Sequence, residues 1–359
     1  MNTRHALLLA NTLFVVCFTN TLSATETSIK QLGSAAEVFI GEEGRAVVTV
    51  DGKLKIAVLS SALYFYDHDT LKEEFIIKLP SVTGPQLDAA GAHNYNTPKL
   101  IVCHDRPDSI WAYGGYHIDA IKHTATEIHG HKGTPYGIAC SSDPNKVYIL
   151  EGKMGGGFIQ PNLTWLIERD VRTMKVTSAR SFAKCFGKIS RTNPIPERAE
   201  IRSLYSVPFE SNRVIVGLSN IAYNWPLKQD CPDPLGYGGG QETELAALYF
   251  IPEKKAMLGW FNPGGMSDGQ QELTLFWKDS KGEWIFKELA ISGTVIKAVS
   301  TLNSAVAVAT DVGLYYTPDV SKPFVKITDE VGSAVLLTPK GTVIFGNEEG
   351  TLKKISLPK

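Results

Sequence analysis

The sequence has no surplus of charge of either sign. Its 359 residues include 36 Lys and Arg against 37 Asp and Glu, so the formal net charge is -1. Without a basic excess we expect no nucleic-acid partner and no general attraction to anionic membranes. The chain also has no long apolar run beyond its first 24 residues, so no transmembrane segment is expected.

Two kinds of binding motif are missing as well. The sequence contains no EF-hand loop and no Cys-x-x-Cys pair. The glycine clusters at 155–157 and 238–240 do not lead from a strand into a helix, so neither predicts a dinucleotide or phosphate site. The cofactor is therefore unknown from these motifs. The histidines discussed below suggest a divalent metal.

The N-terminus predicts a secretory signal peptide over residues 1–24. Arg4 and His5 form a short basic start, residues 6–18 (ALLLANTLFVVCF) are mostly apolar, and Ala24 ends a small-residue cleavage site. An N-terminal core element or a membrane anchor is the alternative, but the run is short for a bilayer. We therefore expect a secreted or periplasmic protein.

Removal of the signal peptide would leave four cysteines, namely Cys103, Cys140, Cys185 and Cys231. An even number in an oxidising compartment fits two disulfide bonds, for which three pairings exist. Cys185 and Cys231 lie in irregular polar stretches, so we predict that they pair. The other two cysteines lie in apolar runs, where they could also be small buried thiols, and their pairing is left open.

Most of the remaining sequence reads as antiparallel β-structure. Short apolar or alternating runs such as 45–50 (RAVVTV) and 305–309 (AVAVA) recur between Gly, Asp, Asn and Pro. They group into units of about 40–50 residues with several strands each, a period typical of propeller blades. The units lie near 45–80, 86–124, 135–179, 200–225, 245–290, 294–328 and 333–356.

The predicted fold is therefore a single all-β domain over residues 25–359, a β-propeller with six or seven four-stranded blades. Six would result if 200–290 were one blade with insertions. The last unit is one strand short, and we expect an N-terminal strand at 36–40 (AEVFI) to complete it and close the ring. A pair of β-sandwich domains is the alternative. The stretches 178–197 and 225–244 depart from the strand pattern and are expected to be long loops.

One segment carries a family resemblance. Residues 133–149 (GTPYGIACSSDPNKVYI) resemble the blade motif of secreted YVTN, NHL and gluconolactonase-type propellers, with Pro135, Gly137 and Asp143 among the matching positions. The resemblance covers one hairpin, the first of a blade, and implies the propeller fold. Gluconolactonase-type enzymes have a metal-binding Asn directly after the proline, whereas this sequence has Tyr136, and a neutral tyrosine is a poor ligand for a hard cation.

The histidines suggest a metal site. After the signal peptide, all seven fall between residues 68 and 131, and His129-Gly130-His131 would place two rings on one face of a strand. If blade ends bring His104 and Asp105 to the same place, these four side chains could bind a divalent transition metal. The alternative is that they are surface and loop histidines with unrelated partners.

Aromatic residues suggest a binding surface instead. Tyr223, Trp225 and Tyr237 flank the Cys231 stretch, where they could stack on a carbohydrate or anchor a protein partner, or could simply pack the loop onto its blade. We predict a binding propeller for an extracellular or periplasmic protein or carbohydrate. The alternatives are a hydrolase or lyase with an axial, lactonase-like metal site, and a cofactor-dependent oxidoreductase.

Overall fold

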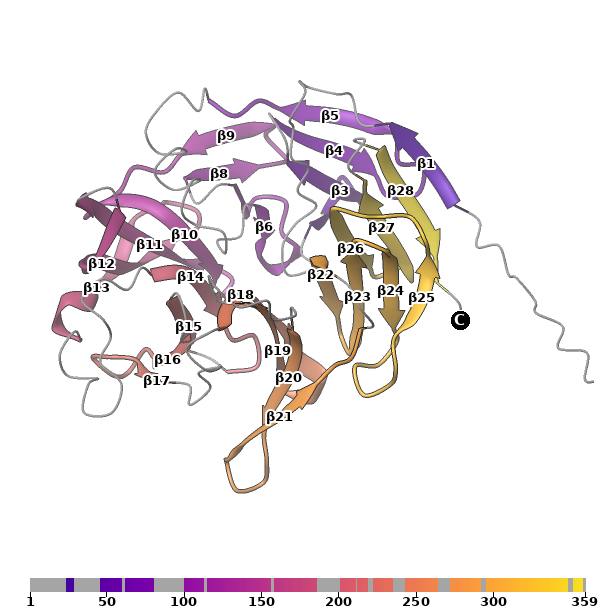
Figure 1. Ribbon diagram of the computed structural model, residues 1–359. Helices are drawn as coiled ribbons and strands as arrows, with labels where there is room; N and C mark the ends of the chain where they lie inside the picture. The colour runs from indigo at the N-terminus through magenta and orange to yellow at the C-terminus, as the bar shows by residue number, and fades with distance from the viewer. Residues whose placement is uncertain are drawn as a thin grey trace, which may run out of the picture.

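Short apolar runs are joined by tight turns, and the regular structure of the described residues is almost all β-strand (Figure 1). In the computed structural model the described residues are 24–28, 46–59, 62–80, 100–112, 115–155, 158–185, 201–210, 212–218, 222–234, 243–263, 272–291, 295–347 and 351–357. They form seven antiparallel sheets of four strands each. The sheets follow one another around a ring, which is the β-propeller that the sequence predicted.

The blades are numbered in chain order. Blades 1 and 2 contain β2 (Val47–Val50), β3 (Lys53–Leu59), β4 (Leu63–Asp67), β5 (Glu73–Ile77), β6 (Leu100–Val102), β7 (Ile110–Ala112), β8 (Tyr116–Asp119) and β9 (Thr124–Glu127). Blades 3 and 4 contain β10 (Thr134–Cys140), β11 (Lys146–Gly155), β12 (Phe158–Asp170), β13 (Val176–Ser181), β14 (Ile201–Ser206), β15 (Arg213–Leu218), β16 (Ala222–Pro226) and β17 (Asp233–Pro234). Blades 5 and 6 contain β18 (Thr243–Ile251), β19 (Ala256–Pro263), β20 (Glu272–Lys278), β21 (Trp284–Glu288), β22 (Ile296–Leu302), β23 (Ala305–Thr310), β24 (Gly313–Thr317) and β25 (Val325–Thr328).

Blade 7 joins the two ends of the chain. It consists of β26 (Ala334–Thr338), β27 (Thr342–Gly346), β28 (Thr351–Ser356) and, as its outer strand, β1 (Ala24–Ser28). Figure 1 shows indigo β1 beside yellow β28. The predicted closure by an N-terminal strand is confirmed, but the strand is Ala24–Ser28 rather than 36–40, which lie outside the described residues. Because an outer edge strand needs no apolar side chains, the polar segment at 24–28 can fill this place.

The blade count of seven resolves the ambiguity between six and seven. Residues 200–290 hold two complete sheets, blade 4 over β14–β17 and blade 5 over β18–β21. The described parts of the stretches expected to be long loops contain regular structure: residues 178–181 complete β13, a 3-10 turn follows at Phe182–Lys184, and Trp225 and Pro226 end β16. In blade 4 the outer strand β17 has only two residues, Asp233 and Pro234, too few for a strand pattern to be recognised in the sequence.

The hydrophobic core lies between the blades rather than at one centre. Buried side chains form one continuous cluster across blades 7, 1 and 2, and separate clusters between blades 2 and 3, 3 and 4, 4 and 5, 5 and 6, and 6 and 7. Each small sheet has two apolar faces, and a neighbour on either side covers them. The seams between blades are therefore where residues distant in sequence meet.

The seam between blades 7 and 1 contains a buried histidine. His68 is 1% exposed, its Nδ1 lies 2.9 Å from Asp69 Oδ1, and its Nε2 lies 3.0 Å from Thr338 Oγ1. Lys340 forms an ion pair with Asp69, and Lys354 Nζ donates to the His68 carbonyl oxygen at 3.2 Å. These bonds connect the β4–β5 turn of blade 1 to the strands that close the ring.

We predict that stability falls as the pH drops below about 6.5, the ordinary pKa of histidine. Burial lowers the pKa of His68, and Asp69 partly offsets this effect. The unfolded chain then binds a proton that the native state resists, which favours unfolding as the pH falls. Burial lowers the pKa of His117 in the same way. Asp69, whose pKa is lowered to about 2, loses its contribution only in more acidic solution.

Denaturant unfolding from pH 7 to pH 5 measures this effect. A His68→Gln variant keeps hydrogen-bonding capacity without a proton to gain, so its stability should depend less steeply on pH than that of the wild type. An unchanged slope in the variant would mean that His68 does not contribute to the pH dependence.

Candidate functional site

Two disulfide bonds join consecutive blades. The predicted pair Cys185–Cys231 is present, and so is Cys103–Cys140, whose pairing the sequence left open. Cys103 follows β6 in blade 2 and Cys140 ends β10 in blade 3, whereas Cys185 follows β13 in blade 3 and Cys231 lies in the turn after β16 in blade 4. The two bonds thus link blades 2, 3 and 4 covalently.

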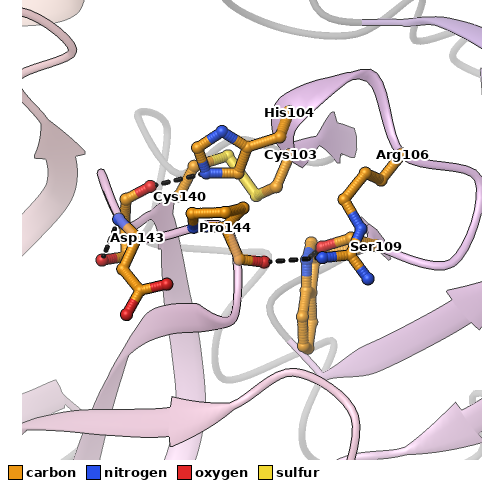
Figure 2. The surroundings of a disulfide bond; sticks show 9 residues. Cys103, His104, Arg106, Ser109, Cys140, Asp143 and Pro144 are labelled. Carbon is orange, nitrogen blue, oxygen red and sulfur yellow. Dashed lines mark hydrogen bonds between the residues drawn. A yellow bond between two sulfur atoms is a disulfide. The ribbon is translucent and has the colours of Figure 1, made fainter.

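Polar contacts reinforce the first of these links (Figure 2). His104 Nε2 lies 2.7 Å from the Ser141 carbonyl oxygen, and Arg106 Nη1 donates to the Pro144 carbonyl oxygen at 2.9 Å. Arg106 also binds Asp108 through two hydrogen bonds, which lowers the pKa of that carboxyl group. Residues of the β6–β7 turn therefore reach across the seam onto the β10–β11 turn of blade 3.

The four side chains predicted as metal ligands are not gathered into one group. Within the described part of the chain, which includes all four, no cluster of three or more His, Cys, Asp or Glu is placed to hold a metal ion. His104 instead contacts Ser141, as above. The His131 amide donates to Glu151 Oε2 at 2.7 Å, and the His129 carbonyl oxygen accepts from Arg169 at 2.8 Å.

Other histidines of the predicted cluster also lie at contacts within or between blades. His123 stacks on Phe75 of blade 1 with ring centroids 4.1 Å apart. His117 packs on Trp111 and its Nε2 lies 2.8 Å from the Asp108 carbonyl oxygen. His93 lies outside the described residues. The histidines are thus close in sequence because blades 1 to 3 are consecutive in the chain, and each described histidine has its own partner.

The three aromatic residues predicted to bind a ligand have different places. Trp225 is fully buried, and its ring meets Phe182 edge-on at 4.7 Å between centroids. Its Nε1 donates to the Gln229 carbonyl oxygen at 3.2 Å. Trp225 therefore packs the turn onto its blade, which was the alternative interpretation. Tyr223 lies on β16 opposite Pro234, and Tyr237 is outside the described residues.

The segment with the family resemblance forms the first hairpin of blade 3, as expected. β10 pairs with β11 from Thr134 to Cys140, with a bulge at Tyr136. The Tyr136 side chain is 1% exposed and belongs to the core between blades 3 and 4. The position that carries a metal-binding Asn in gluconolactonase-type enzymes thus holds a buried packing residue here.

The sequence contains a Gly-x-Ser-x-Gly pattern. Residues 265–269 read Gly-Met-Ser-Asp-Gly, but they lie outside the described residues. In enzymes that use this pattern, a catalytic serine stands on a turn between a strand and a helix. In the sequence the segment lies between β19 and β20.

The structure contains a pocket that the sequence did not predict, in the seam between blades 3 and 4. Its volume is about 220 Å³. The lining comes from three strands of blade 3 and two turns of blade 4: Tyr148, Leu166, Glu168, Ser178, Arg180, Asn212, Leu227 and Lys228. The pocket is smaller than the roughly 300 Å³ at which drug-sized sites begin, so it suits a small ligand or an end group of a larger one.

Strand register explains why the blade 3 residues share the pocket. Glu168 lies directly opposite Tyr148 on β11 and opposite Ser178 on β13, and Leu166 lies opposite Arg180. Residues directly opposite one another in a sheet point to the same face. Buried Tyr148, Leu166 and Leu227 supply an apolar surface, and the other lining residues supply charge and hydrogen-bonding groups.

The disulfide between blades 3 and 4 lies close in sequence to this pocket. It connects Cys185, four residues after β13 ends, to Cys231, three residues after the pocket residue Lys228. Arg180 Nη1 also donates to the Gln229 carbonyl oxygen at 3.3 Å, the same oxygen that accepts from Trp225. Blades 3 and 4, which form the two walls of the pocket, are thus joined by a covalent bond and by the hydrogen bond from Arg180 to Gln229.

Comparisons with known proteins support the fold alone. No protein-family model matches the chain, and no curated protein matches its sequence. A chain of a mitotic checkpoint complex is similar over 100% of both chains, with a TM-score of 0.54 and 12% identity. The extracellular domain of a B. thetaiotaomicron protein assigned as a hybrid two component system is similar over 92% of this chain, with a TM-score of 0.54 and 13% identity.

A second B. thetaiotaomicron structure, the extracellular domain of a protein assigned as a one component system, gives a TM-score of 0.51 at 13% identity. This chain covers only 40% and 39% of the two bacterial chains. The helices in the described part of the chain are too short to cross a membrane.

Proposed function

We propose that this protein is a binding propeller and that the pocket between blades 3 and 4 is its ligand site. The observation that carries the proposal is the pocket itself: a 220 Å³ cavity with apolar side chains and several polar groups between two blades. Small-molecule sites in proteins combine these features. Strands on one side and a disulfide-linked turn on the other hold the lining in place, so little ordering would be needed on binding.

The proposal places the protein outside the cytoplasm, secreted or in the periplasm. Two disulfide bonds between blades support an oxidising compartment. The expected cleavage after Ala24 would leave Thr25–Ser28 of β1 to close the ring. Two of the similar structures are extracellular domains by name, which agrees with this location.

Filling the pocket tests the proposal. In Ser178→Phe a large side chain replaces a half-buried lining residue, and we expect ligand binding to be lost. The matched control is Ala179→Phe, which adds the same bulk to the opposite face of the same edge strand, where Ala179 is exposed.

The measurement is thermal unfolding of wild type and both variants with glucose, glucosamine, glucuronate or inorganic phosphate. At a concentration tenfold above Kd, a bound probe adds about 1.4 kcal/mol to the free energy of unfolding. The proposal requires that at least one probe raises the Tm of the wild type and of Ala179→Phe, but not that of Ser178→Phe. If no probe does so, this pocket is not a binding site.

A further inference from the structure

The charges around the pocket are unbalanced. Arg180 contributes a cation from blade 3 and Lys228 another from blade 4, whereas Glu168 is the one carboxylate among the lining residues. Lys146 is not among the lining residues, but it forms an ion pair with Glu168. The positive electrostatic potential of an excess of cations attracts a negatively charged group.

Glu168 is already satisfied by protein groups. Its Oε1 accepts from Lys146 Nζ at 3.0 Å and from Thr177 Oγ1 at 2.6 Å, and the bond raises the pKa of Lys146. The carboxylate therefore has its own cation, and the positive charge of Arg180 and Lys228 is left over.

Those two cations have spare hydrogen-bond donors. In the described part of the chain Arg180 makes only the bond to the Gln229 carbonyl oxygen, out of the five N–H groups of a guanidinium. No hydrogen bond or ion pair of Lys228 is found among the same residues. The bond to Gln229 orients the guanidinium, since that peptide group is also held by Trp225.

The uncharged lining residues indicate which chemical groups the rest of the ligand should have. Tyr148 and Leu166 are both 3% exposed, and Leu227 is 7% exposed. They form an apolar surface beside Ser178 and Asn212, which can donate or accept hydrogen bonds. A ring with hydroxyl groups on its edge and apolar faces matches such a surface.

We propose that the pocket binds a small anion, with the negative group between Arg180 and Lys228. This inference rests on the proposed function and specifies its ligand class. A carboxylate on a sugar ring and a free phosphate share the charge that the two cations recognise, so the test includes both.

Glucuronate and glucose form a matched pair of probes, because they differ only in the carboxylate. We expect titration calorimetry at constant ionic strength to show binding of glucuronate and about tenfold weaker or no binding of glucose, the difference expected for a charged hydrogen bond. Inorganic phosphate replaces glucuronate in a second titration. Binding of phosphate alone would identify a phosphate site, and binding of glucuronate alone a carboxylate site.

Charge-removing variants locate the binding. Arg180→Gln should weaken anion binding about tenfold or more, and Lys228→Gln should weaken it as well. The control Arg172→Gln removes an exposed guanidinium from the β12–β13 turn of the same blade, outside the pocket, and should bind like the wild type. Equal anion binding in Arg180→Gln and Arg172→Gln would overturn the proposal, because it would reflect a general salt effect.

The outcomes separate this inference from the proposed function. If glucose or glucosamine binds as well as the anions, and Ser178→Phe abolishes that binding, the pocket is a ligand site but not an anion site. If neither anion nor neutral probe binds and Ser178→Phe has no effect, both proposals fail.

Discussion

Replacing Trp225 with alanine is expected to lower the free energy of unfolding by about 3–5 kcal/mol, the usual cost of removing a large buried aromatic side chain. Trp225 is fully buried in the seam between blades 3 and 4, where it packs against Phe182. Its removal leaves a cavity between two blades and frees the Gln229 carbonyl oxygen from a hydrogen bond. Denaturant unfolding followed by far-UV circular dichroism measures the loss.

A second variant separates packing from the hydrogen bond. Trp225→Phe keeps an aromatic ring in the seam but has no N–H, so it should cost less than the alanine variant, by about the cavity contribution. A different result would favour the interpretation of Trp225 as a ligand-binding residue. If Trp225→Ala unfolds like the wild type but no longer binds a ligand, Trp225 is a binding residue and the burial assigned to it is wrong.

Cys231→Ser is expected to cost about 4 kcal/mol, because the disulfide to Cys185 closes a loop with a sequence separation of 46 residues. The bond removes many extended conformations from the unfolded chain, and in the native state it ties the end of blade 3 to the outer turn of blade 4. For a chain of this length the loss corresponds to a fall in Tm of roughly 5 °C.

The control for this prediction is the double variant Cys185→Ser/Cys231→Ser, which leaves no unpaired thiol. It should melt at the same temperature as the single variant if the lost bond is the cause. A thiol assay on the unfolded wild type without residues 1–24, and so without Cys17, should detect no free cysteine. Free thiols in the wild type, together with an unchanged Tm in Cys231→Ser, would contradict the pairing.

A turn of the same sequence pattern occurs in two blades. The β4–β5 turn of blade 1 and the β12–β13 turn of blade 3 both read Asp-x-x-Thr, at 67–70 and 170–173. In each, one carboxylate oxygen of the Asp accepts from two backbone amides and from the Thr hydroxyl group. Leu71 and Met174, which follow these turns, both have positive φ angles. The shared pattern is a local signal in the sequence by which blades 1 and 3 can be aligned.

The turn between β23 and β24 can be recognised from local sequence. The pattern Asp311-Val312-Gly313 is typical of a tight hairpin turn with a glycine at positive φ, and Gly313 has φ +136°. A Cβ at this position would lie 2.3 Å from the Thr328 carbonyl oxygen. The turn itself depends on neighbouring residues alone, so it can be recognised in the sequence.

Patterns within a few residues were enough to predict a β-propeller with four-stranded blades, because strands and hairpin turns depend on local sequence. The sequence also indicated one disulfide. Four outcomes required the three-dimensional structure: Ala24–Ser28 closes the ring, Cys103 bonds to Cys140, the predicted metal ligands form no cluster of three or more, and Arg180 and Lys228 line one pocket. These outcomes depend on how one blade packs against the next, and packing across a seam brings together residues with no periodic relation in the chain.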